Sequence, residues 1–240
     1  MMYRNIVIIG GSGTLGHEFT QQLSTQYPQA NIHAFSRNIP TSKIGNINKY
    51  AIDYKDEDSI QKAAALASKD SPLDMVIVAI GILHDADIMP EKALSALSAE
   101  KFQYIFEVNT IYPALIAKHF LPHLNRNSRS LFAALSARVG SISDNKLGGW
   151  YAYRASKAAL NMTLKNTAIE IERKNKNAIV VGIHPGTVDS KLSKPFQRNV
   201  PEGKLFTAAD SVNKMLEVLE RLTPTDSGKC FGWDNEEIKP

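Results

Sequence analysis

Two hydrophobic patterns alternate along this 240-residue chain. Short, nearly continuous apolar runs recur, and each is followed by a segment in which apolar residues are three or four positions apart. Continuous apolar runs bounded by turn residues predict strands of a parallel sheet, because helices cover both faces of such a sheet. The predicted strands cover residues 5–10, 31–36, 49–53, 74–81, 129–137, 177–186 and 228–233.

The segments with helical spacing predict amphipathic helices. Within residues 153–174, for example, Leu160, Leu164 and Ala168 fall on one face. The other predicted helices cover residues 15–27, 57–70, roughly 91–123, and 208–222. Strands alternating with helices indicate βαβ units with right-handed crossovers. We therefore predict an α/β fold: a Rossmann-type, doubly wound parallel sheet of about seven strands with helices on both faces, in a single domain spanning residues 1–240.

The longest irregular segment covers residues 188–206, directly after a predicted strand. It is polar and contains two prolines. Loops of this length in a compact domain are commonly lids or binding loops, so we expect a substrate loop here. Trp150, Phe196 and Phe206 could shape an apolar pocket beside it, or they could close the core.

Composition narrows the classes of partner. The net charge is +4 and the basic residues are scattered, whereas nucleic-acid binding requires a concentrated basic stripe, so we expect no nucleic-acid partner. No segment approaches the length of a transmembrane helix, so we expect no membrane span. The N-terminus lacks the features of a signal peptide, and the single cysteine, Cys230, suits a reducing compartment. Together these features predict a cytoplasmic protein.

Two histidines, His119 and His123, lie four residues apart on a predicted helix. Such a pair could hold a metal ion. No acid or third ligand presents itself in the sequence nearby, so we expect two ordinary helix histidines and no metal site.

Glycines three residues apart connect the first predicted strand to the first predicted helix. This spacing lets backbone amides approach a pyrophosphate, and the helix N-terminus adds unpaired N–H groups and a positive dipole. The position after the first strand of a βαβ unit favours dinucleotide binding over a glycine-rich turn without a ligand. The expected contacts are Gly10, Ser12, Gly13, Thr14, Leu15 and Gly16.

The end of the second predicted strand bears on the choice of dinucleotide. An acid there would accept a hydrogen bond from the 2′-hydroxyl of NAD, but the chain has Ser36 and Arg37. Arg37 can pair with a 2′-phosphate. The alternative is an arginine that lies on the surface at a strand end and binds no ligand. The positive charge of Arg37, in place of an acid, favours NADP(H) over NAD as the cofactor. Asp53 could bind the adenine amino group, or it could cap the following helix.

Tyr153 and Lys157 are four residues apart, so they project from one face of a helix. A free tyrosine has a pKa of about 10, and a neighbouring ammonium lowers that pKa by favouring the phenolate. Tyr153 could then give its proton to a carbonyl oxygen while hydride arrives at the carbon. Tyr151 has Ala155 four residues on, and is the weaker candidate.

This combination resembles the short-chain dehydrogenase/reductase family, and within it the carbonyl-reductase-like branch that includes sniffer and the bacterial C-factor proteins. The resemblance covers essentially the whole chain. It rests on the Gly10–Gly16 loop, Asp53, Gly81, Asn109, "YRASKAALN" and "HPGTVDSKL". It implies an NADP(H)-dependent oxidoreductase that interconverts a small-molecule carbonyl and an alcohol.

The resemblance also implies a role for each matched residue. Tyr153 would be the proton donor, Lys157 would lower its pKa and bind the nicotinamide ribose, and Asn109 would hold a water that relays protons to Lys157. The residues expected beside the nicotinamide carboxamide or elsewhere along the cofactor are Gly81, Pro185, Gly186, Val188 and Ser190. In this family the helices at 100–123 and 150–174 pair between subunits, which implies a homodimer or homotetramer.

Three positions depart from the family pattern. Thr14 replaces the middle glycine of the loop, and "VAIG" at 78–81 keeps only the final glycine of the usual Asn-Asn-Ala-Gly. Ala137 stands where the family often has its catalytic serine. We expect Ser136 to hold the substrate carbonyl, with the hydroxyls of Ser141 and Ser143 as alternatives. These departures leave open a second function, that of an NADP-binding signalling protein with little turnover.

Overall fold

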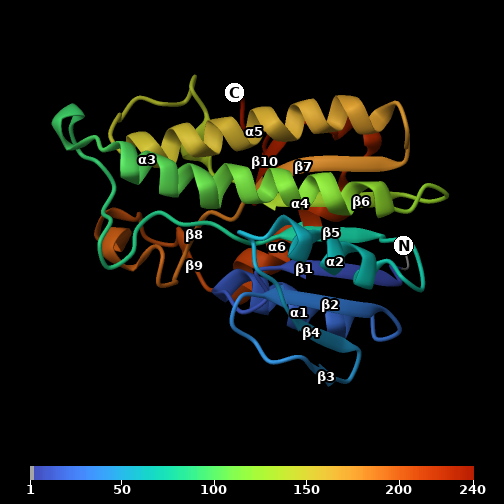
Figure 1. The fold of residues 1–240 in the computed structure, drawn as a ribbon. Helices are drawn as coiled ribbons and strands as arrows, with labels where there is room; N and C mark the ends of the chain where they lie inside the picture. The colour runs from blue at the N-terminus through green and yellow to red at the C-terminus, as the bar shows by residue number, and fades with distance from the viewer. Residues whose placement is uncertain (1–2) are drawn as a thin grey trace.

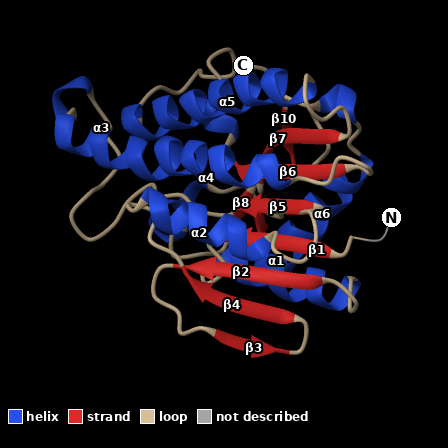
Figure 2. Cartoon of the chain, turned by 45° about the vertical axis from the view of Figure 1, so that its right-hand side comes forward, coloured by secondary structure: helices blue, strands red, loops and turns tan. Residues whose placement is uncertain are grey.

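The strands of the main sheet lie in the order β10-β7-β6-β5-β1-β2-β4-β3. The computed structural model describes residues 3–240 of the chain. Within them the seven strands from β10 to β4 are parallel to their neighbours, and β3 pairs antiparallel with β4 at the edge. The predicted fold class is therefore confirmed, with an antiparallel edge strand that the sequence pattern did not reveal (Figures 1 and 2).

The elements keep the alternating order expected from the sequence. The strands of the main sheet are β1 (Asn5–Ile9), β2 (Asn31–Ser36), β3 (Ser42–Ile44), β4 (Ile47–Ala51), β5 (Met75–Val78), β6 (Ser130–Leu135), β7 (Ala178–His184) and β10 (Cys230–Gly232). A separate pair consists of β8 (Thr187–Val188) and β9 (Leu205–Phe206). The α-helices are α1 (Thr14–Gln26), α2 (Glu57–Ala67), α3 (Ala99–Phe106), α4 (Tyr112–Phe120), α5 (Tyr151–Glu172) and α6 (Ala208–Arg221).

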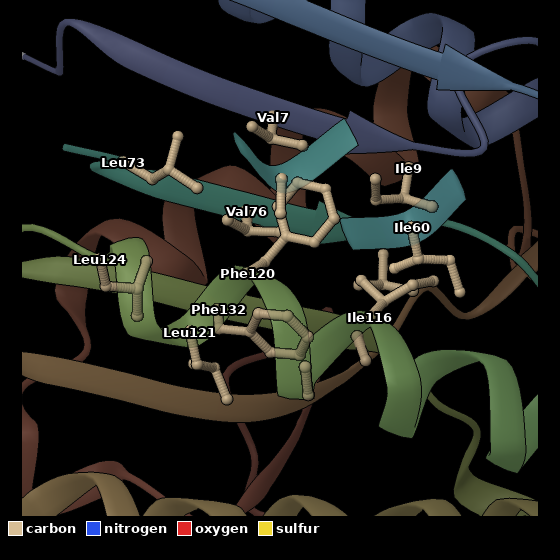
Figure 3. Close-up of a cluster of buried hydrophobic side chains, with 14 of the residues drawn as sticks. Val7, Ile9, Ile60, Leu73, Val76, Ile116, Phe120, Leu121, Leu124 and Phe132 are labelled. Carbon is tan, nitrogen blue, oxygen red and sulfur yellow. The ribbon is translucent and has the colours of Figure 1, made fainter. Parts of the chain in front are cut away.

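Two apolar layers cover the two faces of the sheet. Side chains alternate across a strand, so Val7 and Ile9 of β1 join one layer while Ile6 and Ile8 join the other. The first layer includes residues of α2, α4 and α5, and the second includes residues of α1 and α6. Figure 3 shows part of the first layer, where Phe120 of α4 lies among side chains of the sheet.

The strand order reverses beside β1, whose neighbours are β2 on one side and β5 on the other. The connection after β1 therefore leads to one half of the sheet, and the connection after β5 leads to the other half. Open α/β sheets bind ligands in the crevice that such a reversal leaves at the carboxyl ends of the strands. The fold thus places the glycine loop and the residues that follow β5 at one crevice.

The prediction of one long helix over residues 91–123 was wrong in two respects. The first regular helix, α3, begins only at Ala99, where the hydroxyl of Ser98 accepts from the backbone N–H of Lys101 at 3.5 Å. A five-residue π-helix over Glu107–Ile111 then separates α3 from α4. Pro113 has no N–H for the carbonyl of Asn109 four residues earlier, so a regular α-helix cannot continue through this turn.

Two histidines are held in a neutral form by burial. The Nδ1 atoms of His33 on β2 and His184 on β7 are buried and, within residues 3–240, have no hydrogen-bond partner. Burial lowers the pKa of each imidazole to about 4, and for His184 the charge of Arg138 acts in the same direction. Protonation of either ring would place a proton on a buried nitrogen that has no acceptor beside it within the described residues.

We predict that stability falls as pH falls from about 6.5 to about 4. In that window the unfolded chain binds protons that the folded chain does not, because the unfolded imidazole has a pKa of about 6.5. Urea denaturation followed by circular dichroism at several pH values measures the slope. His33→Gln should flatten it, and the exposed control His17→Gln should not. Equal slopes for wild type and His33→Gln would contradict the prediction.

Candidate active site

A cleft of about 540 Å³ lies at the carboxyl ends of the central strands. The glycine loop forms one wall, and the residues that follow β5, β6 and β7 form the floor. Residues of α5 and of the 188–200 segment close the other side. The sequence-predicted residues that line this cleft are Ser12, Gly13, Thr14, Leu15, Gly81, Ser136, Tyr153, Lys157, Pro185, Gly186, Val188 and Ser190.

The glycine loop brings the start of α1 against the end of β1. Gly10 has φ +89°, and a β-carbon there would lie 2.7 Å from the carbonyl oxygen of Ala79. A β-carbon on Gly16 would lie 2.1 Å from the carbonyl oxygen of Gly10. Gly10 and Gly16 therefore serve close packing behind the cleft, and both positions require glycine.

The first turn of α1 faces the cleft. Its N-cap, Gly13, offers no side chain to the unpaired N–H groups of that turn. Ser12, Thr14 and Leu15 line the cleft beside it. Unpaired N–H groups and the positive end of a helix dipole form a site for a phosphate group.

Ser36 braces the glycine loop from behind. Its side chain is buried, and its Oγ accepts the backbone N–H of Ser12 at 2.8 Å. The N–H groups of Gly10 and Gly11 both donate to the carbonyl of Phe35, at 2.8 Å and 3.0 Å. The predicted cofactor contact Ser36 thus lies outside the cleft lining and fixes the loop that forms its wall.

Arg37 and Asp53 lie beyond the glycine loop, near the ends of β2 and β4, and both are exposed. Burial raises the pKa of Tyr54 to about 12, and the positive charge of nearby Arg37 acts in the opposite direction. Asp53 Oδ1 accepts the backbone N–H of Lys55 at 2.9 Å. The alternative that Asp53 caps the next helix was wrong, because Asp56 caps α2.

Tyr153 and Lys157 line the same cleft from α5. Lys157 Nζ lies 5.9 Å from the centre of the Tyr153 ring and donates to the carbonyl of Leu135 at 2.9 Å. The side chain of Lys157 is buried, with 3% of its surface exposed, and burial lowers its pKa to about 8.

The expected lowering of the Tyr153 pKa is not found in this cleft. Burial raises the pKa of Tyr153 to about 12. The phenolate is a charged form, so removal of water disfavours it. With its pKa raised in this way, Tyr153 is protonated at neutral pH.

Asn109 ties the π-helix to two walls of the cleft. It is fully buried, its Oδ1 accepts the N–H of Ile82, and its Nδ2 donates to the carbonyl of Ile82, both at 2.8 Å. Nδ2 also donates to Ser156 Oγ on α5 at 3.1 Å. A β-carbon on Gly81 would lie 3.4 Å from Asn109 Oδ1 and 3.5 Å from Lys157 Nζ. Asn109 and Lys157 therefore converge beside Gly81.

The three candidate serines occupy different positions. Ser136 lines the cleft, but its hydroxyl donates to Asn161 Oδ1 at 2.6 Å. The hydroxyls of Ser141 and Ser143 lie 3.3 Å from each other, and neither residue lines the cleft. Ala137 does line it. Ser136 is thus the candidate that reaches the cleft, with its proton engaged by a neighbour.

An aromatic wall stands over Tyr153. The ring of Trp150 meets that of Tyr153 at a centroid distance of 6.2 Å and that of Phe196 at 5.0 Å. His84 packs edge-on against Phe196, and its Nε2 lies 3.1 Å from the carbonyl oxygen of Leu192. Trp150 and Phe196 line the cleft, so the prediction of an apolar pocket holds for these two residues.

Phe206 lies elsewhere, at the neck of the 188–206 loop. Its ring packs on Trp233 at 4.6 Å, and β8 pairs with β9 beside it. Gly186 has φ +75°, and a β-carbon there would lie 2.7 Å from the Phe206 ring. The two ends of the loop are therefore held together, and its middle lies over the cleft.

Other site classes receive no support from the described part of the chain. No group of three potential metal ligands occurs within residues 3–240. Beside His119 the structure places an acid that the sequence did not reveal, with Glu57 Oε1 at 2.9 Å from Nε2. Within the same residues, no helix combines the length and the apolar character that spanning a membrane would need.

The family model described as short chain dehydrogenase matches residues 4–201. This chain belongs to the short chain dehydrogenase family. The glycine loop, Asn109, Tyr153 and Lys157 all lie inside the matched segment. This short chain dehydrogenase is thus an oxidoreductase by family.

Two relatives of known name are similar to this chain in sequence. It is 33% identical over 133 residues to the C-signal protein of Myxococcus xanthus. That match covers 55% of this chain and 75% of the C-signal protein. It is 25% identical over 225 residues to the 1-hydroxy-2-glutathionyl-2-methyl-3-butene dehydrogenase of Rhodococcus sp. (strain AD45), which covers 93% of this chain and 94% of the relative.

Solved structures agree on the fold over the whole chain. The NADPH-bound carbonyl reductase from chicken fatty liver superposes with a TM-score of 0.85 at 25% identity, covering 100% of both chains. Carbonyl reductase Sniffer of D. melanogaster superposes with a TM-score of 0.84 at 22% identity, with the same coverage. The resemblance to the short-chain dehydrogenase family is confirmed, and the match to C-signal supports the C-factor-like branch within it. The likeness to Sniffer supports the same fold.

Proposed function

We propose that this short chain dehydrogenase is an NADP(H)-dependent oxidoreductase that interconverts a carbonyl and an alcohol. The observation that carries the proposal is the shared cleft. The open N-terminus of α1 and the pair Tyr153 and Lys157 line one cavity of about 540 Å³. A phosphate site and a proton donor on opposite walls of one cleft suit a dinucleotide with a substrate beside its reactive end.

The residues present fit the dinucleotide. The first turn of α1 would bind the pyrophosphate, and the buried Lys157 has donors to spare for the ribose hydroxyls. Pro185, Gly186, Val188 and Ser190 would lie along the nicotinamide carboxamide. When bound, this cofactor supplies or accepts the hydride.

The adenosine end favours the phosphorylated cofactor. Arg37 is exposed at the end of β2, where no acid stands to accept from a 2′-hydroxyl. Its guanidinium would pair with the 2′-phosphate, and Asp53 would accept from the adenine amino group. The chicken carbonyl reductase with the same fold binds NADPH, which agrees with this choice.

Tyr153 would act as the acid in the reduction. Its raised pKa of about 12 keeps the hydroxyl protonated, so the proton is present when negative charge develops on the carbonyl oxygen. Lys157, with a pKa of about 8, is mostly an ammonium at neutral pH and stabilises the phenolate left behind. The carbonyl of Asn109, deprived of an α-helical donor by Pro113, would hold a water that returns protons to Lys157.

The substrate would enter beneath the 188–206 loop. Trp150 and Phe196 stand over Tyr153, and the surrounding lining contains Leu83, Val139 and Leu192. An apolar lining suits an uncharged aldehyde or ketone with an apolar substituent. Ser136 would orient the carbonyl oxygen by a hydrogen bond once its hydroxyl turns away from Asn161.

A second function has one specific observation in its favour. Ala137 contributes no hydroxyl to the cleft, and the proton of Ser136 is engaged by Asn161. An NADP-binding signalling protein with little turnover would tolerate this arrangement. The relative named C-signal agrees with that alternative.

The expected homodimer or homotetramer stays a prediction. Ile111, Met162 and Ile169, on the π-helix and α5, are between 43% and 62% exposed. Their exposed apolar surface is what a subunit contact along these helices would cover.

We predict that Tyr153→Phe lowers kcat for carbonyl reduction by about 10²–10⁴-fold, the usual contribution of a general acid. The NADPH Kd should stay unchanged, because the ring remains in place. The measurement is NADPH oxidation against a panel of aldehydes and diketones, beside a fluorescence titration of NADPH. Full turnover in Tyr153→Phe would refute the role of the acid. Binding without turnover in the wild type would favour the signalling protein.

We also predict that Arg37→Ala raises the Kd for NADPH by about 10–100-fold, which corresponds to a charge-assisted hydrogen bond of roughly 1.5–3 kcal/mol. The Kd for NADH should change little. Arg126→Ala, which removes an exposed arginine far from the glycine loop, is the matched control. Equal losses for NADPH and NADH would show that Arg37 does not read the 2′-phosphate.

A further inference from the structure

Glu91 is an acidic residue that is buried. It lies in the long connection between β5 and α3, and only 3% of its surface is exposed. Within the described residues it forms no salt bridge, although a buried carboxylate is costly unless it is paired. The compensation must come from other groups around it.

Those groups belong to the first turn of α5. Glu91 Oε2 accepts the backbone N–H of Ala152 at 3.2 Å, and the carbonyl oxygen of Glu91 accepts the N–H of Trp150 at 2.5 Å. The N-cap of α5 is Trp150, which provides no side-chain hydrogen bond to the helix. Glu91 therefore acts as the missing cap from a distant segment, and its negative charge lies at the positive end of the helix.

The same contact restrains an unusual backbone. Trp150 has φ 51° and ψ 43°, a left-handed conformation that is rare for a bulky residue. It follows Gly148 and Gly149, both with φ 64°. A bulky non-glycine residue in this region is strained, and the conformation persists where its surroundings impose it. The bond from the N–H of Trp150 to the carbonyl of Glu91 is one such restraint.

The restrained turn bears directly on the cleft. Tyr153 comes directly after Ala152, and the Trp150 ring packs against both Tyr153 and Phe196. A shift of this turn would move the phenol and the aromatic wall together. A misplacement of about 1 Å can lower the rate about 10²-fold, so we expect kcat to depend on the position of this turn.

We propose that Glu91 is a positioning residue for the reduction, which fixes the first turn of α5 so that Tyr153 and Trp150 hold their places in the cleft. The inference rests on the proposed function, because it assumes that Tyr153 is the acid. Glu91 itself lies outside the cleft lining and acts through α5.

The kinetic test compares E91A with E91Q. E91A should lower kcat by about 10-fold or more while the NADPH Kd stays within about twofold, because α1 and Lys157 are untouched. E91Q keeps an oxygen for the N–H of Ala152 and should recover most of the lost kcat. D56A is the matched control, since Asp56 caps α2 away from the cleft: it should lower the melting temperature and leave kcat unchanged.

A structural readout separates failure of this inference from failure of the proposed function. The chain has two tryptophans, so in a W233F background the fluorescence reports Trp150 alone. E91A in that background should shift the emission and increase quenching by acrylamide, whether or not the protein turns over a carbonyl.

Three results would overturn the inference: wild-type kcat in E91A, an E91Q as slow as E91A, or unchanged Trp150 fluorescence in E91A. If Tyr153→Phe kept full turnover, the proposed function would fail, and the fluorescence shift would still test the placement of the turn.

Discussion

The cleft depends on the burial of one ammonium group. Lys157 lies almost wholly out of water, with the carbonyl of Leu135 as its hydrogen-bond acceptor within the described chain. Burial of a charge with so few partners is unfavourable, and the lowered pKa of about 8 reflects this. The surrounding structure must hold α5 firmly against the sheet. A β-carbon on Gly140 would lie 2.8 Å from the Lys157 β-carbon, so glycine is required for this approach.

Two hydrogen bonds fix the start of α5, and both reach residues that precede Lys157. Asn109 reaches Ser156 from the π-helix, and Glu91 reaches the first turn from the loop after β5. Both come from segments that precede α5 by more than forty residues. Tyr153 lies between the two contacted residues, Ala152 and Ser156, so its phenol is held in the cleft, where it can donate its proton despite the raised pKa. The tight packing of α5 against the sheet thus both buries the charge of Lys157 and makes the site rigid.

Much of the fold could be predicted because the sheet is buried on both faces. The strands that became β1, β5, β6 and β7 are continuous apolar runs, and the glycine spacing marked the loop after β1. The short edge strand β3 could not be predicted, since its three residues are exposed and carry no apolar pattern. The break before α3 and the π-helix were also missed, because apolar spacing continues through both while proline and capping chemistry interrupt the hydrogen bonds.

The site was predicted where a local pattern carries the chemistry. The interval between Tyr153 and Lys157 and the glycine loop are such patterns. Three other features depend on contacts between segments far apart in the sequence, so no local pattern predicts them. They are the hydrogen bond from Ser12 to Ser36, the bond between Ser136 and Asn161, and the cap that Glu91 provides for α5. The pKa of Tyr153 was expected to fall because the ammonium is close, whereas the loss of water around the phenol raises it.

A double-mutant cycle on the single-turnover rate tests most directly whether Tyr153 and Lys157 act as one unit. The rate of NADPH oxidation would be measured at saturating cofactor and carbonyl substrate in Tyr153→Phe, Lys157→Met and the double variant. If Lys157 acts by stabilising the Tyr153 phenolate, the double variant will be about as slow as Tyr153→Phe alone. Two independent losses that multiply in the double variant would contradict the account.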